Sequence, residues 1–142
     1  MKKVVLDSSV LVSAFLTPRG TPATLLARAR RGAFSVHLSN EIIEETARAL
    51  LRPKTMARYR YTAHDVKEYL VLLTEVTEAV EDIPTLRAVP IDPKEDMIVA
   101  TAVKAGADYL VAGDRRHLVP LGEYRGSRIV TPREFLEILA NE

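Results

Sequence analysis

The sequence contains no cysteine and only three histidines among its 142 residues. The lack of cysteine excludes disulfide bonds, thiolate zinc sites and cysteine nucleophiles. A metal ion would therefore be bound by oxygen atoms or by the histidines. No apolar run approaches the roughly 20 residues that cross a bilayer, and the N-terminal Met-Lys-Lys leads directly into a strand-like run with no signal-peptide pattern. We expect a cytoplasmic protein that makes no contact with a membrane.

Acidic residues are missing from one long stretch of the chain. The total charge is close to neutral, at +1, and does not by itself indicate a partner. Residues 46–64, however, include no Asp or Glu, and their basic residues are interleaved with tyrosines. This pattern is typical either of a solvated helix face or of a surface for single-stranded nucleic acid, which needs charge for phosphates and aromatic faces for bases. The residues concerned are Arg48, Arg52, Lys54, Arg58, Arg60, Tyr59 and Tyr61.

The length and the 47% hydrophobic content predict one domain, residues 1–142, with a substantial core. Short β-branched runs alternate with longer segments of helical period, which predicts an α/β domain with a mainly parallel sheet. A Thr-Pro-Arg-Glu start signal at 131–134 and a Gly106 stop signal support two of the helices. The predicted strands are 3–6, 35–38, 109–111 and 128–130, with weaker candidates at 76–80 and 88–89. The predicted helices are 22–31, 40–51, 63–73, 96–105 and 132–140.

Two acids, Asp7 and Asp114, each come first after a predicted strand. In an open parallel sheet, ligands bind outside the carboxyl ends of the strands, so both side chains are expected at that edge. Each acid also has a structural alternative. Asp7 can cap a helix that begins at Ser8, and Asp114 can cap a turn after Gly113.

Further acids fall near the starts of predicted helices. Glu44 and Glu45 flank the apolar face of helix 40–51, where a glutamate is usually just solvated. Glu95 completes an Asp-Pro-Lys-Glu segment that is similar to a capping box. Asp96 follows in the first turn, where the helix dipole favours an acid. Taken one at a time, these acids fit structural or surface roles.

Taken together, the acids predict a metal site. Carboxylates that converge on one edge without a cation raise one another's pKa values. A set of ligands made only of oxygen suits Mg²⁺ or Mn²⁺. Such ions orient a water, lower its pKa and neutralise the charge that grows on a phosphate under attack. The pattern therefore indicates nuclease chemistry.

Four blocks of the sequence resemble the PIN-domain family, and specifically its VapC-like toxin components of toxin–antitoxin pairs. They read VVLDSSVLVSAFL, LSNEIIEETARALLRP, DPKEDMIVATAVKAGADYLVAGDRRHL and RIVTPREFL, and from the first to the last they span nearly the whole chain, residues 4–136. The resemblance implies a three-layer α/β/α sandwich and a Mg²⁺- or Mn²⁺-dependent endoribonuclease. It also implies an RNA substrate, an antitoxin protein as partner, and a homodimer or higher homo-oligomer.

The resemblance assigns roles to particular acids. The first and last family acids match Asp7 and Asp114. The second lies six residues after a helix-opening Ser, which from Ser39 selects Glu45 over Glu44. The apolar face of the helix alone leaves that choice open.

The third family acid is less clearly matched. It lies seven residues before the last Ala of an ATA-like run, which from Ala102 indicates Glu95. The family usually has Asp there, so Asp96 stays an alternative. The predicted catalytic and metal-binding residues are Asp7, Glu45, Glu95, Asp96 and Asp114.

Residues beside the acids are candidates for binding the substrate. Ser8 keeps the hydroxyl that the family has after its first acid, whereas Ser9 replaces an amide. Arg115 and Arg116 adjoin Asp114, and Arg can bind phosphate through two hydrogen bonds. Ser8, Arg115 and Arg116 are therefore the predicted substrate-binding residues.

Two other functions are weighed against the nuclease. Phosphatases with an aspartate nucleophile need an acid two residues after the first, where this chain has Ser9. A PIN-fold protein that binds RNA or protein with little or no turnover is the second alternative, because Glu95 and Ser9 depart from the family pattern.

Overall fold

The computed structural model of the protein describes residues 1–86, 93–113 and 118–142. The weak strand prediction at 88–89 and the predicted site residues Asp114, Arg115 and Arg116 lie outside these ranges. Within them, six strands form one sheet in the order β3-β2-β1-β4-β6-β5. Every neighbouring pair is parallel except β5 and β6. The strands are β1 Lys3–Leu6, β2 Ser35–Ser39, β3 Glu78–Val80, β4 Tyr109–Val111, β5 Glu123–Tyr124 and β6 Ser127–Val130.

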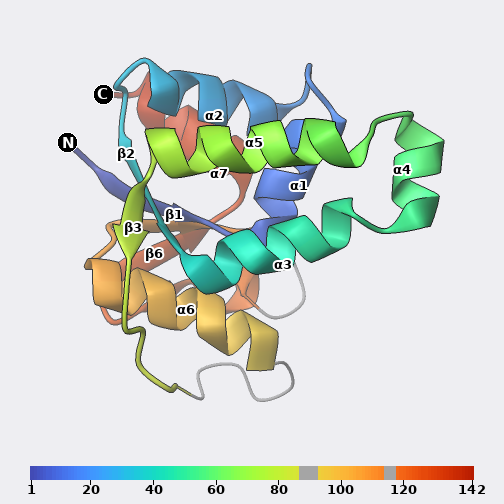
Figure 1. Cartoon of the computed structure of the whole chain (residues 1–142). Helices are drawn as coiled ribbons and strands as arrows, with labels where there is room; N and C mark the ends of the chain where they lie inside the picture. The colour runs from blue at the N-terminus through green and yellow to red at the C-terminus, as the bar shows by residue number, and fades with distance from the viewer. Residues whose placement is uncertain (87–92, 114–117) are drawn as a thin grey trace.

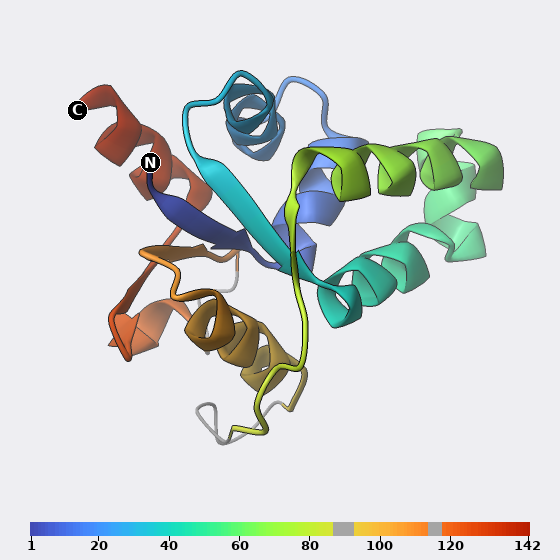
Figure 2. The same cartoon turned by 60° about the vertical axis from the view of Figure 1, so that its left-hand side comes forward.

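Helices cover both faces of the sheet. Helices α2, α5 and α7 lie on one side and α6 on the other (Figures 1 and 2). The predicted three-layer α/β/α fold is therefore confirmed. None of these helices in the described part of the chain is long and apolar enough to span a membrane. The helices are α1 Ser8–Leu16, α2 Thr21–Arg30, α3 Asn40–Leu50, α4 Pro53–Tyr59, α5 Ala63–Val76, α6 Pro93–Ala105 and α7 Pro132–Ala140, with a 3-10 turn, η1, at Val119–Leu121.

Strand β1 lies inside the sheet between β2 and β4. Its residues Val4, Val5 and Leu6 are at most 1% exposed, as expected for a parallel strand covered on both faces. From β1 the chain continues to β2 on one side, whereas β4 lies on the other side and leads to β5 and β6. The order of the strands thus reverses between β1 and β4, and at such a point a crevice opens outside the carboxyl ends of the strands.

The strongest sequence signals for helix ends are confirmed. Thr131 caps α7 by accepting from the Glu134 N–H at 3.1 Å, while the Glu134 carboxylate accepts from the Thr131 N–H. Helix α6 ends at Ala105, and Gly106 follows with a φ of 63°. The Ala107 N–H then donates to the Ala102 carbonyl, which satisfies a carbonyl of the last turn.

Two helices were not predicted as such. The sequence indicates helix α1 only through the capping alternative for Asp7, because the serines and apolar residues of Ser8–Leu16 show little helical period. Helix α4 buries none of its side chains, so it has no apolar face for a periodicity analysis to detect. Its one sequence signal is Pro53 at the first helical position.

Some predicted boundaries were wrong by a few residues. Helix α6 begins at Pro93 and not at residue 96, because proline's fixed φ suits the first helical position. Helix α5 continues to Val76, so that β3 begins only at Glu78.

The lowered pKa of His37, on β2, leads us to predict that the stability of the protein depends on pH. Partial burial, with a smaller effect of the Lys3 charge, lowers the pKa of His37 below its ordinary value of 6.5, although Glu78 opposes the shift. The unfolded chain therefore takes up a proton at a higher pH than the folded protein, and the free energy of unfolding should fall as the pH drops through 6.5. Urea denaturation between about pH 7.5 and 5.5 measures the slope. His37→Gln should reduce it. The same change at exposed His64 should leave the His37 contribution intact, and an unchanged slope in His37→Gln would contradict the prediction.

Candidate active site

Asp7 occupies the point where β1 ends and α1 begins. Its side chain is only 2% exposed. Oδ1 accepts from the Val10 N–H at 2.9 Å, which caps α1, and from the Ser9 hydroxyl at 2.7 Å. Oδ2 accepts from the Gly113 N–H at 3.3 Å. The capping alternative for Asp7 is thus confirmed, and the same carboxylate also contacts the end of the neighbouring strand segment.

Gly113 brings the chain after β4 against the start of α1. The Asp7 N–H donates to the Val111 carbonyl at 3.0 Å, which continues the β1–β4 pairing to this edge. A Cβ on Gly113 would lie 2.9 Å from the Ser9 Oγ, so only glycine fits without displacing that hydroxyl. Gly113 directly precedes Asp114, which itself lies outside the described residues. The two strand ends identified from the sequence therefore meet at Asp7 and Gly113.

A cleft of about 330 Å³ opens beside this junction, between α1 and α3. Helix α1 contributes Ser8, Ser9, Val12 and Ser13 to its wall. The opposite wall is built from α3 and the residues that adjoin it, and it carries one acid and several basic groups. These residues are Glu45, Arg48, Ala49 and Arg52, with Lys94 from the first turn of α6.

The two neighbouring glutamates of α3 have different surroundings. Glu45 is partly buried and lines the cleft with Ser8 and Ser9. Glu44 is exposed and accepts from the Asn40 side-chain amide at 3.2 Å, one turn earlier on the helix. Of the pair, only Glu45 therefore lines the cleft beside Ser8 and Ser9.

The two acids of α6 lie in its first turn. Asp96 is only 9% exposed. Glu95 is partly buried, and its Oε2 atom is inaccessible to solvent. Lys94, the residue before them, lines the cleft. The beginning of α6 therefore adjoins the same cleft as Glu45.

The described acids do not by themselves form a complete metal site. Within residues 1–86, 93–113 and 118–142, no group of three or more His, Asp or Glu side chains could hold one metal ion. Glu45 lines the cleft beside Ser8 and Ser9, which follow Asp7 in the chain, and the acids of α6 follow Lys94, which lines the cleft as well. A metal site here would depend on Asp114 as well.

Two tyrosines and a phenylalanine connect the helices that form the cleft with α5. The Tyr69 hydroxyl of α5 donates to the Leu11 carbonyl of α1 at 2.7 Å, and burial raises the pKa of Tyr69. The Tyr61 hydroxyl donates to the Leu50 carbonyl at the end of α3. Phe15 of α1 packs against both rings, at centroid distances of 4.9 and 5.0 Å. These contacts fix α1 relative to α3 and α5.

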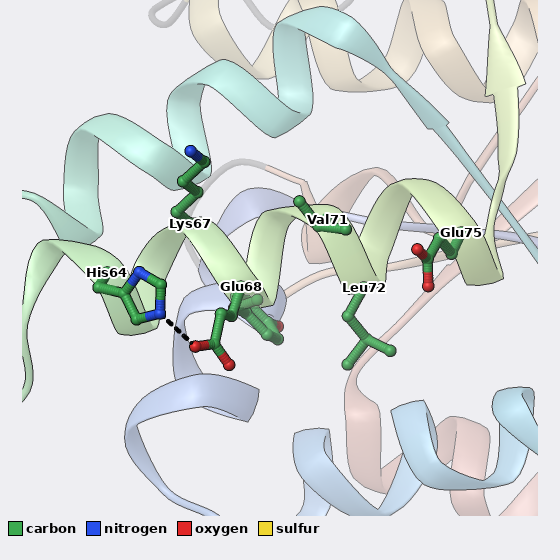
Figure 3. Close-up of a pocket in the computed structure, with 7 residues that line it drawn as sticks. His64, Lys67, Glu68, Val71, Leu72 and Glu75 are labelled. Carbon is green, nitrogen blue, oxygen red and sulfur yellow. Dashed lines mark ion pairs between the residues drawn. The ribbon is translucent and has the colours of Figure 1, made fainter.

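A second surface hollow lies along α5, away from the acidic junction. Its lining residues His64, Lys67, Glu68, Leu72 and Glu75 follow one another along the helix (Figure 3). No residue that the sequence predicted for the active site lines it. We assign no catalytic role to this hollow.

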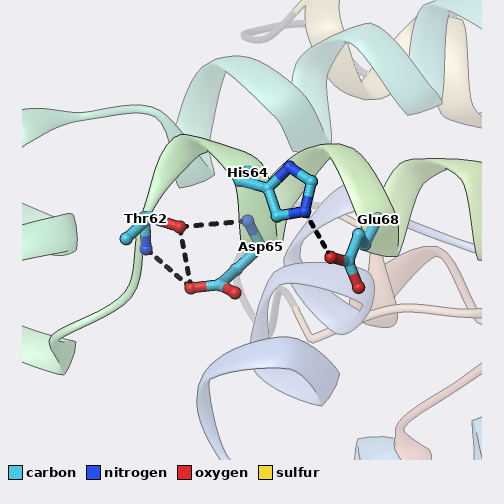
Figure 4. Close-up of polar contacts among 4 residues, drawn as sticks. All are labelled: Thr62, His64, Asp65 and Glu68. Atoms are coloured by element: carbon cyan, nitrogen blue, oxygen red, sulfur yellow. Dashed lines mark hydrogen bonds and ion pairs between the residues drawn. The ribbon is translucent and has the colours of Figure 1, made fainter.

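The polar contacts at the start of α5 have a structural role. Thr62 caps the helix by accepting from the Asp65 N–H, and the Asp65 carboxylate accepts from the Thr62 N–H at 2.8 Å (Figure 4). The hydrogen bonds that the Asp65 carboxylate accepts from the Thr62 N–H and from the Thr62 hydroxyl lower the pKa of Asp65. His64 pairs with Glu68 one turn later, at 2.6 Å. Asp65, Glu68 and His64 therefore have contacts within α5 that stabilise this helix.

Comparison with known families agrees with the geometry. The model of the family described as PIN domain matches residues 3–116, well over half of the chain. The chain belongs to the PIN-domain family. PIN domains are generally nucleases that bind RNA and typically use divalent metal ions. No curated protein matches the sequence.

Some residues of this PIN domain's cleft were not predicted as site residues. Ser9 and Gly113 hold the Asp7 carboxylate in place, and Arg48 and Arg52 line the cleft. The arginines could have been found by their spacing, since they follow Glu45 by three and seven residues and so continue its helix face. The contact of Ser9 with Gly113 has no local signal, because it joins residues about a hundred positions apart.

The close approach of Gly113 to Ser9 predicts coupled effects of two substitutions. Gly113→Ala should displace the Ser9 hydroxyl from the Asp7 carboxylate and lower the free energy of unfolding by about 1 kcal/mol, the contribution of that hydrogen bond. Ser9→Ala removes the obstructing oxygen, so Gly113→Ala should cost about 1 kcal/mol less in that background. Urea denaturation of the two single variants and the double variant measures this coupling. Equal costs of Gly113→Ala in both backgrounds would show that the contact does not constrain the junction.

Proposed function

We propose that the protein is a metal-dependent endoribonuclease that hydrolyses phosphodiester bonds of single-stranded or structured RNA. The observation that carries the proposal is the hydrogen bond from the Gly113 N–H to the Asp7 carboxylate, at the point where the strand order reverses. It joins the ends of the two strands that carry the first and last predicted acids. Membership of a nuclease family supports the same conclusion.

The side chains that we propose as metal ligands suit Mg²⁺ or Mn²⁺, because all of them are carboxylates and would bind the ion through oxygen atoms. A bound divalent ion lowers the pKa of a water molecule and neutralises charge that develops on the phosphate. The residues that would hold it are Asp7, Glu45, Asp114 and either Glu95 or Asp96. The described acids form no group of three, so Asp114 is essential to this assignment.

The surrounding residues would prepare these acids for their roles. The Ser9 hydroxyl and the Val10 and Gly113 amides orient the Asp7 carboxylate. Ser8, which lines the cleft, offers a hydroxyl to the substrate. Arg115 and Arg116 follow Asp114 in the sequence and would bind phosphate.

The physiological role that we propose is that of the toxin in a toxin–antitoxin pair. The VapC-like sequence blocks support it. Such a protein would act in the cytoplasm as a single domain, residues 1–142, would self-associate as a homodimer or higher homo-oligomer, and would be inhibited by an antitoxin protein.

Two features favour a second candidate function. The described acids include no group of three that could hold a metal ion, and Glu95 stands where the family usually has Asp. A PIN-fold protein that binds RNA or protein with little turnover would tolerate both features.

Two adjacent glutamates provide a matched test of the proposed nuclease. Glu45→Gln should abolish the cleavage of RNA in Mg²⁺ or Mn²⁺, because it removes a charge that faces the cleft. Glu44→Gln should leave cleavage near the wild-type level, because Glu44 is exposed and contacts Asn40. Asp7→Asn should also abolish cleavage while the protein stays folded, as circular dichroism can verify.

The assay follows a labelled single-stranded RNA by gel electrophoresis, with EDTA as the control for metal dependence. A wild-type protein that cleaves no RNA in either metal would favour the binding function. Cleavage at the wild-type rate by Glu45→Gln or Asp7→Asn would show that the assigned site is wrong.

A further inference from the structure

The α3 wall of the cleft carries positive charge immediately beside the predicted catalytic acid. Glu45, Arg48 and Ala49 lie on one face of α3, and Arg52 continues that face just beyond the helix end. Arg48 and Arg52 are exposed to solvent. A ligand that reaches Glu45 along this wall would therefore pass both guanidinium groups.

In the part of the chain that the structure describes, the two arginines have no structural partner that explains their position. Within the described residues, the side chains of Arg48 and Arg52 form no ion pair and no hydrogen bond. Arg48 lies in the last turn of α3, where the helix dipole favours a cation, but Arg52 lies outside the helix. Two unpaired guanidinium groups on one wall of a cleft suit an anion that binds there, because Arg can donate two hydrogen bonds to a phosphate.

Helix α4 extends the same positive charge beyond the cleft. It begins directly after Arg52 and connects α3 with α5 at the end that lies away from the sheet (Figure 1). It buries none of its residues and carries Lys54, Arg58 and Tyr59. The Tyr59 side chain is 44% exposed, and the Arg58 guanidinium lies over its ring, 5.5 Å from the centroid.

We propose that Arg48, Arg52, Lys54, Arg58 and Tyr59 form a binding surface for single-stranded RNA that leads into the cleft at Glu45. We call these five residues the basic track. The proposal rests on the proposed nuclease function for the identity of its ligand. Single-stranded nucleic acid is favoured because its phosphates match the cations and its unstacked bases can stack on an exposed tyrosine. The absence of any acid in residues 46–64 removes local repulsion of a polyanion.

Arg48 and Arg52 act in this proposal as positioning residues. They would hold backbone phosphates along the α3 wall, while Glu45 on the same wall and the other predicted acids act on the bond that is cleaved. Substitution of these arginines should therefore lower both the affinity for RNA and the dependence of that affinity on salt, because each phosphate contact releases condensed counterions.

The test is the binding of a fluorescein-labelled oligouridylate about twelve nucleotides long. Fluorescence anisotropy is measured in EDTA, so that the RNA stays intact, over a series of salt concentrations. Arg48→Ala/Arg52→Ala should raise Kd about tenfold or more. It should also lower the slope of log Kd against log salt by about 0.7 for each lost contact. Tyr59→Ala should raise Kd with little change in that slope, because stacking releases no counterions.

Matched variants isolate the position of the charge. Arg28→Ala/Arg30→Ala removes the same charge from the end of α2, just before β2 begins and thus at the opposite edge of the sheet. This control should change Kd much less. Arg48→Lys/Arg52→Lys should keep most of the salt slope, because it keeps the charge. Thermal melts should be nearly unchanged in all of these variants, since the side chains are exposed.

Three results would overturn the basic track. In the first, Arg48→Ala/Arg52→Ala binds RNA with the wild-type Kd and the wild-type salt slope. In the second, Arg28→Ala/Arg30→Ala loses as much affinity for RNA as Arg48→Ala/Arg52→Ala does. In the third, polyglutamate of the same charge displaces the RNA at the same concentration. The last result would indicate a surface for acidic protein segments. Binding that depends on the basic track in a protein that cleaves no RNA would contradict the nuclease alone, whereas cleavage without that dependence would contradict the basic track alone.

Discussion

The arrangement of this protein depends on the hydrogen bonds of one buried carboxylate. Asp7 accepts from the Val10 N–H and so begins α1, and it accepts from the Gly113 N–H and so joins the end of β1 to the segment after β4. The strand order reverses between these two strands. Because the carboxylate serves the helix cap and the strand junction together, the same side chain positions the start of α1 and the segment after β4 beside the cleft.

The sheet could be predicted from the sequence because its strands are short, apolar and buried. Strands β1 and β4 were predicted with their observed bounds. Helix α4 could not be predicted from periodicity, since it buries nothing. Strand β5 was missed because it is only two residues long, and because its turn has Arg125, with a φ of 47°, before Gly126, where Asn-Gly is the usual signal. The two strand ends at the site were predictable from chain order, whereas the contact of Ser9 with Gly113 arises only from tertiary structure.

Opposite charges are separated within the cleft by the geometry of one helix. Glu45 lies nearer the start of α3, beside the strand ends, while Arg48 lies one turn further on and Arg52 follows the helix. A phosphodiester needs both kinds of group, since cations hold its backbone and acids can bind the metal ion that nucleases use. The spacing of residues along α3 therefore places an acidic and a basic region on the same helix face. The core does not constrain these side chains, because they lie at the surface.

Paramagnetic broadening by Mn²⁺ tests most directly whether the acids at this junction share one ion. In ¹H–¹⁵N NMR spectra, substoichiometric Mn²⁺ should broaden the amide signals of Asp7, Glu45, Asp96 and Asp114 together, and Mg²⁺ should reverse the effect by competition. Signals of Asp65 and Glu68 on α5 should remain sharp at the same concentration. Broadening that begins at α5, or that reaches Asp7, Glu45 and Asp114 at widely different concentrations, would contradict a single shared site.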